Sequence, residues 1–279
     1  MIVYERERCG VVSVEGADTF SYLQGLVSQD LDGLGDGESV RSLLLQPQGK
    51  LTAVFRLIRV DGEHAVLVTD EGFGPVLADA LNRFRIRVKA DVTDRSDTWS
   101  VLSVRGGAAA PVHGAYTLPA VGGVDLVGAA DVITLERATL VEQGASLGNP
   151  EMFERERIEA GVPRLGVDID EKTIPQEAFL ERDAVSFSKG CFLGQELVCR
   201  IDTRGHVNKY LRRVEVAGAV PQPGADVVID DRSVGTLTSV AATPTGAVAL
   251  GMLRREVEPP ADVHVRWSDE DVPAHVTDV

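Results

Sequence analysis

The spacing of hydrophobic positions divides the chain into a mixed part and an all-β part. Over the first ninety residues, alternating apolar runs predict strands at residues 11–15, 40–46, 50–60, 64–69 and 86–92. Helices are predicted after Asp18, a plausible N-cap, and at residues 74–84. Turn sequences at Pro47-Gln48-Gly49 and Asp61-Gly62 separate the central strands. This order indicates a split β-α-β arrangement, β-α-β-β-α-β.

The same order partly repeats from Trp99. The pattern predicts a strand at 99–105, short strands up to Val141, a helix at 150–160, a strand at 185–190 and a helix at 194–202. After about Lys209 the helical pattern disappears. Short strands then follow at near-regular spacing, at residues 210–216, 225–230, 234–241, 247–253 and 263–267, which is typical of a small barrel or sandwich.

These patterns predict an α+β protein in three parts. Two ferredoxin-like halves are expected at residues 1–95 and 96–208, and a C-terminal β-barrel domain at residues 209–279. The barrel is expected to contain no catalytic residue, because no nucleophile and base occur together after its start.

Composition and charge narrow the function classes. The chain of 279 residues has a formal net charge of −15, which opposes generic nucleic-acid binding. No apolar run is long enough to span a membrane, the first residues lack the apolar region of a signal peptide, and three scattered cysteines fit a reducing compartment. We therefore expect a cytoplasmic protein with no membrane partner.

One stretch breaks the acidic trend. Between residues 182 and 213 the basic residues are Arg182, Lys189, Arg200, Arg204, Lys209, Arg212 and Arg213. The stretch is consistent with a small anionic ligand, with a limited patch for an anionic partner, or with an ordinary solvated face.

The sequence KGCFLGQE, at residues 189–196, contains the strongest candidate chemistry. On a predicted strand end, Lys189 and Cys191 point to the same face, and a nearby ammonium favours a thiolate, as does the start of a helix near Gly194. The alternative is that Cys191 is a small apolar core residue beside Phe192. Cys199 reads as a core residue, and since no histidine pairs with either cysteine, no metal site is expected.

KGCFLGQE resembles the signature of the YgfZ family, folate-binding proteins related to the T-protein (aminomethyltransferase) of the glycine cleavage system. Residues 20–31 (FSYLQGLVSQDL), 43–51 (LLLQPQGKL), 157–177 (RIEAGVPRLGVDIDEKTIPQE) and 234–253 are similar to further segments of these relatives, in the same order. The resemblance implies two ferredoxin-like halves and a β domain around a central tetrahydrofolate site, and a role in the assembly or repair of iron–sulfur enzymes.

The resemblance also implies roles for single residues. Cys191 is expected to be the reactive thiol, tuned by Lys189. The candidate folate contacts are Gln46, Glu159, Gln176, Glu177, Gln195 and Arg200. Each has a plainer alternative: Glu159 as a solvated helix residue, Gln176 and Glu177 as caps after Pro175, and Gln195 as a first-turn residue.

One departure bears on activity. Aminomethyltransferases carry two aspartates four and five residues after the turn glycine, whereas this chain has Ala53 and Val54 after Gly49. Without that carboxylate, no residue is evident that handles an amine donor. Whether the protein is an enzyme stays open. The alternatives are a folate-dependent one-carbon transferase and a protein- or tRNA-binding module without catalysis, and the partners expected are folate and iron–sulfur client proteins.

Overall fold

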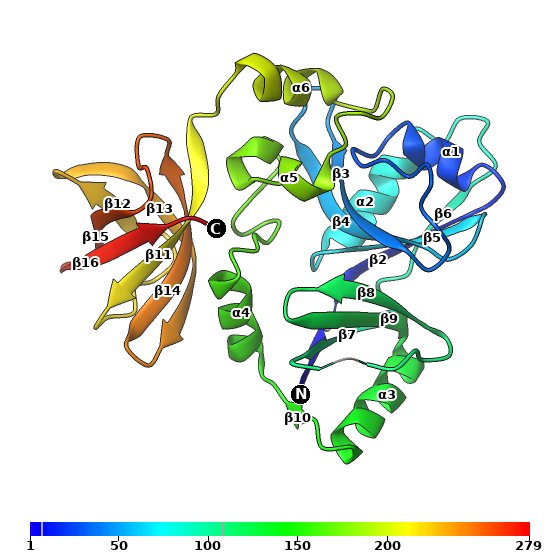
Figure 1. Cartoon of the computed structure of the whole chain (residues 1–279), viewed down its shortest axis with the longest axis horizontal. Coiled ribbons are helices and arrows are strands. Elements are labelled where there is room, and N and C mark those ends of the chain that lie inside the picture. Colours follow the sequence, from blue (N-terminus) through cyan, green and yellow to red (C-terminus); the bar gives the residue numbers. More distant parts are fainter. Residues whose placement is uncertain (7, 108) are drawn as a thin grey trace. The chain divides into compact units, whose positions relative to one another are not determined.

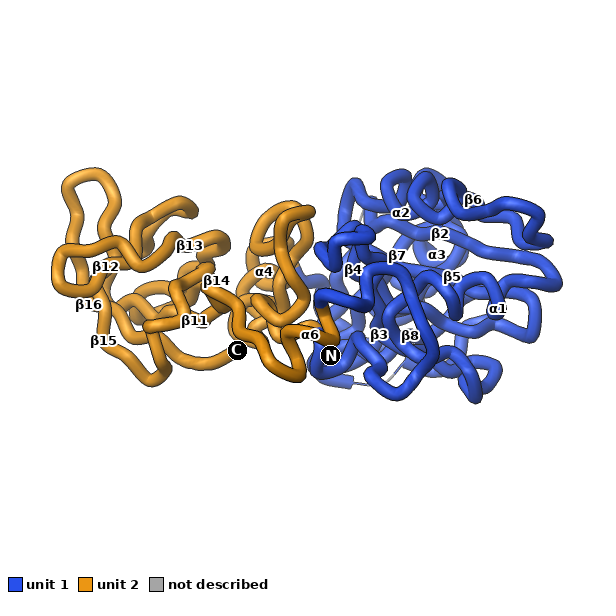
Figure 2. Tube along the Cα trace, turned by 90° about the horizontal axis from the view of Figure 1, so that it is seen from above, with its two compact units in different colours: residues 1–148, 181–197 blue, residues 149–180, 198–279 orange. Residues whose placement is uncertain are grey.

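The computed structural model describes residues 1–6, 8–107 and 109–279, in two compact units (Figure 2). Unit 1 comprises residues 1–148 and 181–197, and unit 2 comprises residues 149–180 and 198–279. The division into two units is another partition than the three predicted parts, whose boundaries at residues 95 and 208 stay a prediction. Among the described residues, no helix is both long and apolar enough to cross a membrane.

The first sheet of unit 1 follows the predicted order closely (Figure 1). Its elements are β2 (Gly10–Glu15), α1 (Thr19–Gln24), β3 (Ser39–Leu45), β4 (Leu51–Arg59), β5 (His64–Thr69), α2 (Phe73–Asn82) and β6 (Asp91–Asp94), and the strands are ordered β3-β4-β5-β2-β6. Three strands lie between the helices, as the separate strand predictions have it, so the summary order β-α-β-β-α-β is one strand short. The last strand begins five residues later than predicted, because residues 86–90 form a loop instead.

The second sheet begins with the N-terminus of the chain. β1 (Ile2–Arg6) lies between β10 (Ser146–Leu147) and β7 (Trp99–Arg105), and β9 (Gly123–Ala129) and β8 (Ala115–Ala120) complete the order β10-β1-β7-β9-β8. The first strand therefore belongs to the second sheet.

The prediction of short strands up to Val141 was wrong in its last part, which forms helix α3 (Ala130–Glu142). Its β-branched residues favour a strand locally. However, Ile133 and Leu140 are seven residues apart, two helical turns, and both are buried in one core with Leu102 and Leu126 of the sheet. Tertiary packing of this face outweighs the local preference.

The two sheets share a core. Cys9, Val11 and Val68 on the first side pack in one cluster with Val101 and Val127 of the second sheet. A charged cluster also joins the sheets: the buried Asp125 of β9 pairs with Arg56 of β4, with Arg105 at 2.9 Å and with Arg6 at 3.5 Å. Burial raises the pKa of Asp125, but the three arginines outweigh this and lower it to about 2.

Shorter elements follow the sheets: α4 (Pro150–Glu159), the 3₁₀ turn η1 (Pro175–Ala178), α5 (Glu181–Ala184) and α6 (Gln195–Arg204). Asn149 caps α4, with its side chain accepting from Met152 N at 2.8 Å, and Pro150 occupies the first turn. The predicted strand at 185–190 was wrong: these residues are irregular and pair with no sheet.

Unit 2 ends in a closed barrel. Its strands are β11 (Lys209–Ala217), β12 (Asp226–Ile229), β13 (Arg232–Thr243), β14 (Gly246–Arg254), β15 (Ala261–Trp267) and β16 (Glu270–Thr277), ordered β11-β14-β13-β12-β15-β16. Sequence analysis missed β16, whose pattern is polar and contains Pro273. Pairing with β11 on one side and β15 on the other supplies its backbone partners. Val214, Val227 and Val265 are buried in the barrel core.

Candidate functional site

The segment before Cys191 docks on the end of α1. Ser28 Oγ donates to Ala184 O at 2.6 Å, and Ser186 N donates to Ser28 O at 3.0 Å. Gln29 Nε2 donates to Asp183 O at 2.9 Å. Two of these bonds hold the end of α5, and the third holds Ser186 at the start of the irregular segment, whose backbone is thus fixed there without a sheet partner.

Lys189 fixes the end of this segment. Its side chain is buried, and its ammonium donates to three backbone carbonyl oxygens, Gln24 O at 2.8 Å, Val27 O at 2.8 Å and Gln29 O at 2.9 Å. Carbonyl groups at a helix end lack helical partners, so a lysine is a suitable donor there. Burial lowers the pKa of Lys189 to about 8, and Asp30 and Asp32 oppose that lowering.

Cys191 lies in a different environment from Lys189. Its side chain is exposed, whereas the neighbouring Phe192 is buried, with its ring centroid 5.6 Å from the Lys189 ammonium. Because residues 185–190 are not a strand, the expectation that Lys189 and Cys191 share one face was wrong. Of the other cysteines, Cys9 is buried and Cys199 is half-buried on α6.

The Gly-Gln-Glu part of the motif packs on the turn after β3. Gly194 has φ +79°, and a Cβ there would lie 2.4 Å from Gln46 O. A Cβ on Gly49 would lie 2.7 Å from Leu197 Cβ. Only glycines allow this approach. The structure thus brings Gln46 next to the Gly194-Gln195 turn, and Gln46 Nε2 donates to Leu51 O at 3.0 Å.

Gln176 and Glu177 lie together in η1 of unit 2, and both are buried. Glu177 Oε2 accepts from Ile174 N at 3.0 Å, which is the capping role considered as its plainer alternative. Gln176 Nε2 donates to Val198 O at 2.9 Å, while its Oε1 is buried and has no hydrogen-bond partner in the part of the chain that the structure describes. A buried acceptor without a donor costs about 1–3 kcal/mol.

The remaining candidates are peripheral within their own unit. Glu159 is exposed on α4, where Arg155 lies 3.8 Å from its carboxylate, in keeping with a solvated helix residue. Arg200 is exposed on α6. In the basic stretch, Lys189 and Arg212 are buried, so it is not a uniformly solvated face.

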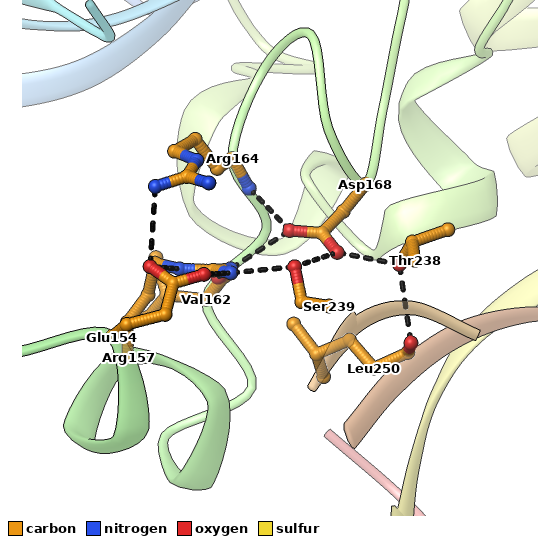
Figure 3. Close-up of polar contacts among 8 residues, drawn as sticks. All are labelled: Glu154, Arg157, Val162, Arg164, Asp168, Thr238, Ser239 and Leu250. Atoms are coloured by element: carbon orange, nitrogen blue, oxygen red, sulfur yellow. Dashed lines mark hydrogen bonds and ion pairs between the residues drawn. The ribbon is translucent and has the colours of Figure 1, made fainter. Parts of the chain in front are cut away.

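A buried carboxylate, which sequence analysis missed, anchors the loop before η1 to the barrel (Figure 3). Asp168 Oδ2 accepts from Arg157 Nη1 at 2.8 Å and from Arg164 N at 2.9 Å, and its Oδ1 accepts from Thr238 Oγ1 at 2.5 Å and Ser239 Oγ at 2.7 Å. Neighbouring strand residues normally point to opposite faces. Here a register shift between Leu237 and Ser239 marks a bulge that lets both hydroxyls reach one carboxylate.

Known proteins resemble this chain in its barrel, in sequence over most of its length, and in fold. The family model of the CAF17 C-terminal β-barrel domain matches residues 209–277. The tRNA-modifying protein YgfZ of Klebsiella pneumoniae is 26% identical over 283 residues, covering 92% of this chain and 86% of that protein. The chain is a relative of the YgfZ proteins.

In two further relatives, the matched region covers a smaller share of the relative's own length. An uncharacterized protein of Haemophilus influenzae is 29% identical over 203 residues, which cover 70% of this chain and 66% of that protein. The mitochondrial iron–sulfur cluster assembly factor IBA57 homolog of Mycosarcoma maydis is 29% identical over 221 residues, covering 72% of this chain and 53% of that protein. The chain thus spans just under two thirds of the first and about half of the second.

A solved structure shares the fold. The glycine cleavage system aminomethyltransferase T of Bartonella henselae matches with a TM-score of 0.86 at 16% identity, covering 100% of this chain and 85% of that one. At this identity the likeness establishes the fold alone. The predicted resemblance and the predicted α+β fold with a C-terminal barrel are confirmed.

Proposed function

We propose that this protein binds tetrahydrofolate and supports the assembly or repair of iron–sulfur enzymes, with Cys191 as its reactive thiol. Relatives named as a tRNA-modifying protein and as an iron–sulfur cluster assembly factor support the cellular role. The folate part rests on the sequence resemblance and on the chemistry of Gln176.

The unpartnered Gln176 oxygen is the observation that carries the folate proposal. A reduced pterin carries amine and ring N–H donors, and such a donor would satisfy the buried amide oxygen. In unit 2, Gln176 and the neighbouring Glu177 carboxylate would hold the pterin edge. Gln46 and Gln195, which lie in unit 1, stay candidate contacts that rest on the resemblance alone. Arg200 is proposed to attract the carboxylates of the glutamate tail, and Glu159 is the weakest candidate because its carboxylate already lies near Arg155.

One-carbon transfer from an amine donor is the second candidate function, and the structure gives it less support. The two positions that carry aspartates in aminomethyltransferases are Ala53 and Val54, and both are buried apolar residues of β4. A carboxylate at Ala53, which is fully buried, would need a partner to offset its desolvation. Binding of folate without turnover of an amine donor is therefore the expected behaviour.

Calorimetry under anaerobic conditions tests the folate proposal. Titration with tetrahydrofolate should give saturable binding, and adding a methylamine-type donor should yield no transfer product. Gln176→Leu should weaken binding about tenfold, which corresponds to one lost hydrogen bond to a buried acceptor. Gln143→Leu, an exposed glutamine after α3, is the matched control and should bind normally. Absence of binding, or equal affinity of the two variants, would refute the proposed site.

Thiol labelling and complementation test the role of Cys191. Because Cys191 is exposed and Cys9 is buried with a pKa raised by that burial, Cys191 should be alkylated faster at neutral pH. In cells lacking the protein, Cys191→Ser should fail to restore the activity of iron–sulfur enzymes, whereas Cys199→Ser should restore it. Full rescue by Cys191→Ser would remove the thiol from the proposal and leave folate binding untouched.

A further inference from the structure

The loop between α2 and β6 (Figure 1) has a composition unlike the rest of the chain. Its first seven residues alternate between cationic and apolar side chains and are Arg83, Phe84, Arg85, Ile86, Arg87, Val88 and Lys89. No acidic residue occurs among them, although the whole chain has 43 acidic residues against 28 lysines and arginines. The loop is therefore a local positive and apolar feature on an acidic protein.

Two of the three apolar side chains of this loop are exposed, and the third, Val88, is half-buried. Ile86 is 76% exposed, the largest value among the exposed large hydrophobic side chains in the described part of the chain, and Phe84 is 41% exposed. Scattered exposed apolar residues are common, but two of them within three residues, each flanked by cationic side chains, are typical of an interaction surface.

The backbone of the loop is held in place at both ends. Phe84 N donates to Leu81 O at 3.0 Å at the end of α2. At the other end, Lys89 N donates to Asp18 Oδ2 at 2.8 Å and Asp18 N donates to Lys89 O at 3.1 Å. Between them Arg87 has φ +59°, a left-handed conformation that side chains other than glycine rarely adopt. A shape fixed before binding reduces the entropy that a partner must offset.

Most of the cationic side chains of the loop form no ion pair within the part of the chain that the structure describes. Arg85 pairs with Asp91 at 2.7 Å. The side chains of Arg83, Arg87 and Lys89 make no hydrogen bond or ion pair with any residue that the structure describes. Three positive charges thus surround an exposed apolar tip without internal partners.

We infer that residues 83–89 form a docking loop for a protein surface that presents an apolar pocket rimmed by carboxylates. Charge complementarity favours a rim of carboxylates. The most exposed apolar side chain is the aliphatic Ile86, which fits a pocket because it has no ring to stack on a base, whereas the aromatic Phe84 is the less exposed of the two. Three arginines and a phenylalanine also match the composition of interface anchors. A nucleic acid is disfavoured because a net charge of −15 repels a long polyanion, whereas a carboxylate rim needs only local attraction.

Site-specific photocrosslinking in cells tests this inference independently of folate binding. The full-length protein carries p-benzoylphenylalanine in place of Ile86, or in place of Leu135 as the control, because Leu135 is 70% exposed on α3. A second version combines the probe at position 86 with Arg83→Glu and Arg87→Glu. The partner found in any protein adduct is then purified, and hydrogen exchange of amides 84–88 is measured with and without it.

The inference predicts a discrete protein adduct from position 86 that is absent from position 135 and falls at least about tenfold in the charge-reversed version. The purified partner should slow exchange of amides 84–88. Adducts with RNA or lipid only, no adduct specific to position 86, insensitivity to charge reversal, or unchanged exchange would each overturn it. The charge-reversed protein should keep its melting temperature, since neither arginine makes a side-chain bond within the described chain.

Discussion

Replacing Lys189 by methionine separates two roles for this lysine, holding the Cys191 segment and tuning its thiol. Methionine keeps the length and apolar stem of the side chain but removes the ammonium. Gln24 O, Val27 O and Gln29 O then lose their donor. The perturbation is confined to unit 1, where all of these residues lie.

The expected loss of stability follows from these contacts. Hydrogen bonds from a charged donor contribute about 1.5–3 kcal/mol each. Burial of the ammonium offsets several kcal/mol of the total. We therefore expect Lys189→Met to lower the free energy of unfolding of unit 1 by about 2 kcal/mol at neutral pH.

The pH dependence has a definite sign. Burial lowers the pKa of Lys189 from 10.5 to about 8, so between these two values the unfolded chain binds more protons than the folded chain. Stability contributed by Lys189 therefore rises with pH across this window and is flat below it. The methionine variant should lack this rise.

The positions of the two tryptophans allow the unfolding of unit 1 to be measured separately. The chain has two, Trp99 in unit 1 and Trp267 in the barrel, so urea unfolding in a Trp267→Phe background reports unit 1 by fluorescence. Lys172→Met, at an exposed lysine, is the control. If Lys189→Met has an unchanged unfolding midpoint but its Cys191 is alkylated tenfold more slowly, then Lys189 does not hold the segment and instead tunes the thiol directly.

Three further variants test the surroundings of the site, each followed by the tryptophan of its own unit. Asp125 contributes about 2 kcal/mol to the free energy of unfolding above pH 4, and this contribution is lost as the pH falls toward its pKa of about 2. Asp125→Asn should remove it. Acid unfolding at the same pH in both proteins would contradict this role of Asp125. Asp168→Asn removes the buried carboxylate that pairs with Arg157 and should lower the free energy of unfolding of unit 2 by about 3 kcal/mol. A loss of less than about 1 kcal/mol would contradict this. Gly194→Ala should cost unit 1 about 2–4 kcal/mol, whereas Gly190→Ala, with no atom within 4 Å of the added Cβ, should cost less than 1 kcal/mol.

Local patterns predicted the elements that bury one regular face. Strands 64–69 and 99–105 were predicted to the residue, because alternating or continuous apolar runs bounded by turn residues leave little choice of structure. Helix α3 and strand β16 were missed because packing and pairing with other elements, and not a regular local pattern, stabilise them; β16 pairs with the distant β11 as well as with the adjacent β15. In α3 only Ile133 and Leu140 are buried, and in β16 the barrel supplies the pairing.

The site was predictable in part. Gln46 and Gln195 were both among the candidate contacts, but the close approach of Gly194 to Gln46 O, which brings Gln46 next to that turn, was not predicted. The environment of Lys189 was not predictable, because its acceptors are backbone carbonyls more than 150 residues away, and backbone groups leave no trace in the sequence. Asp168 was missed for a similar reason, since its partners Thr238 and Ser239 meet it only through a bulge in β13.

Two of the buried polar candidate residues, Lys189 and Gln176, differ in whether their hydrogen-bonding capacity is filled. The Lys189 ammonium has three protons and three close carbonyl acceptors, so a ligand that approached it would have to displace bonds already made. Gln176 has its donor filled by Val198 O and its acceptor empty. A ligand that donates to Gln176 therefore gains a hydrogen bond and removes an existing penalty at the same time. This difference places Lys189 with the scaffold that presents Cys191, and it makes Gln176 the residue at which ligand binding should change the free energy most.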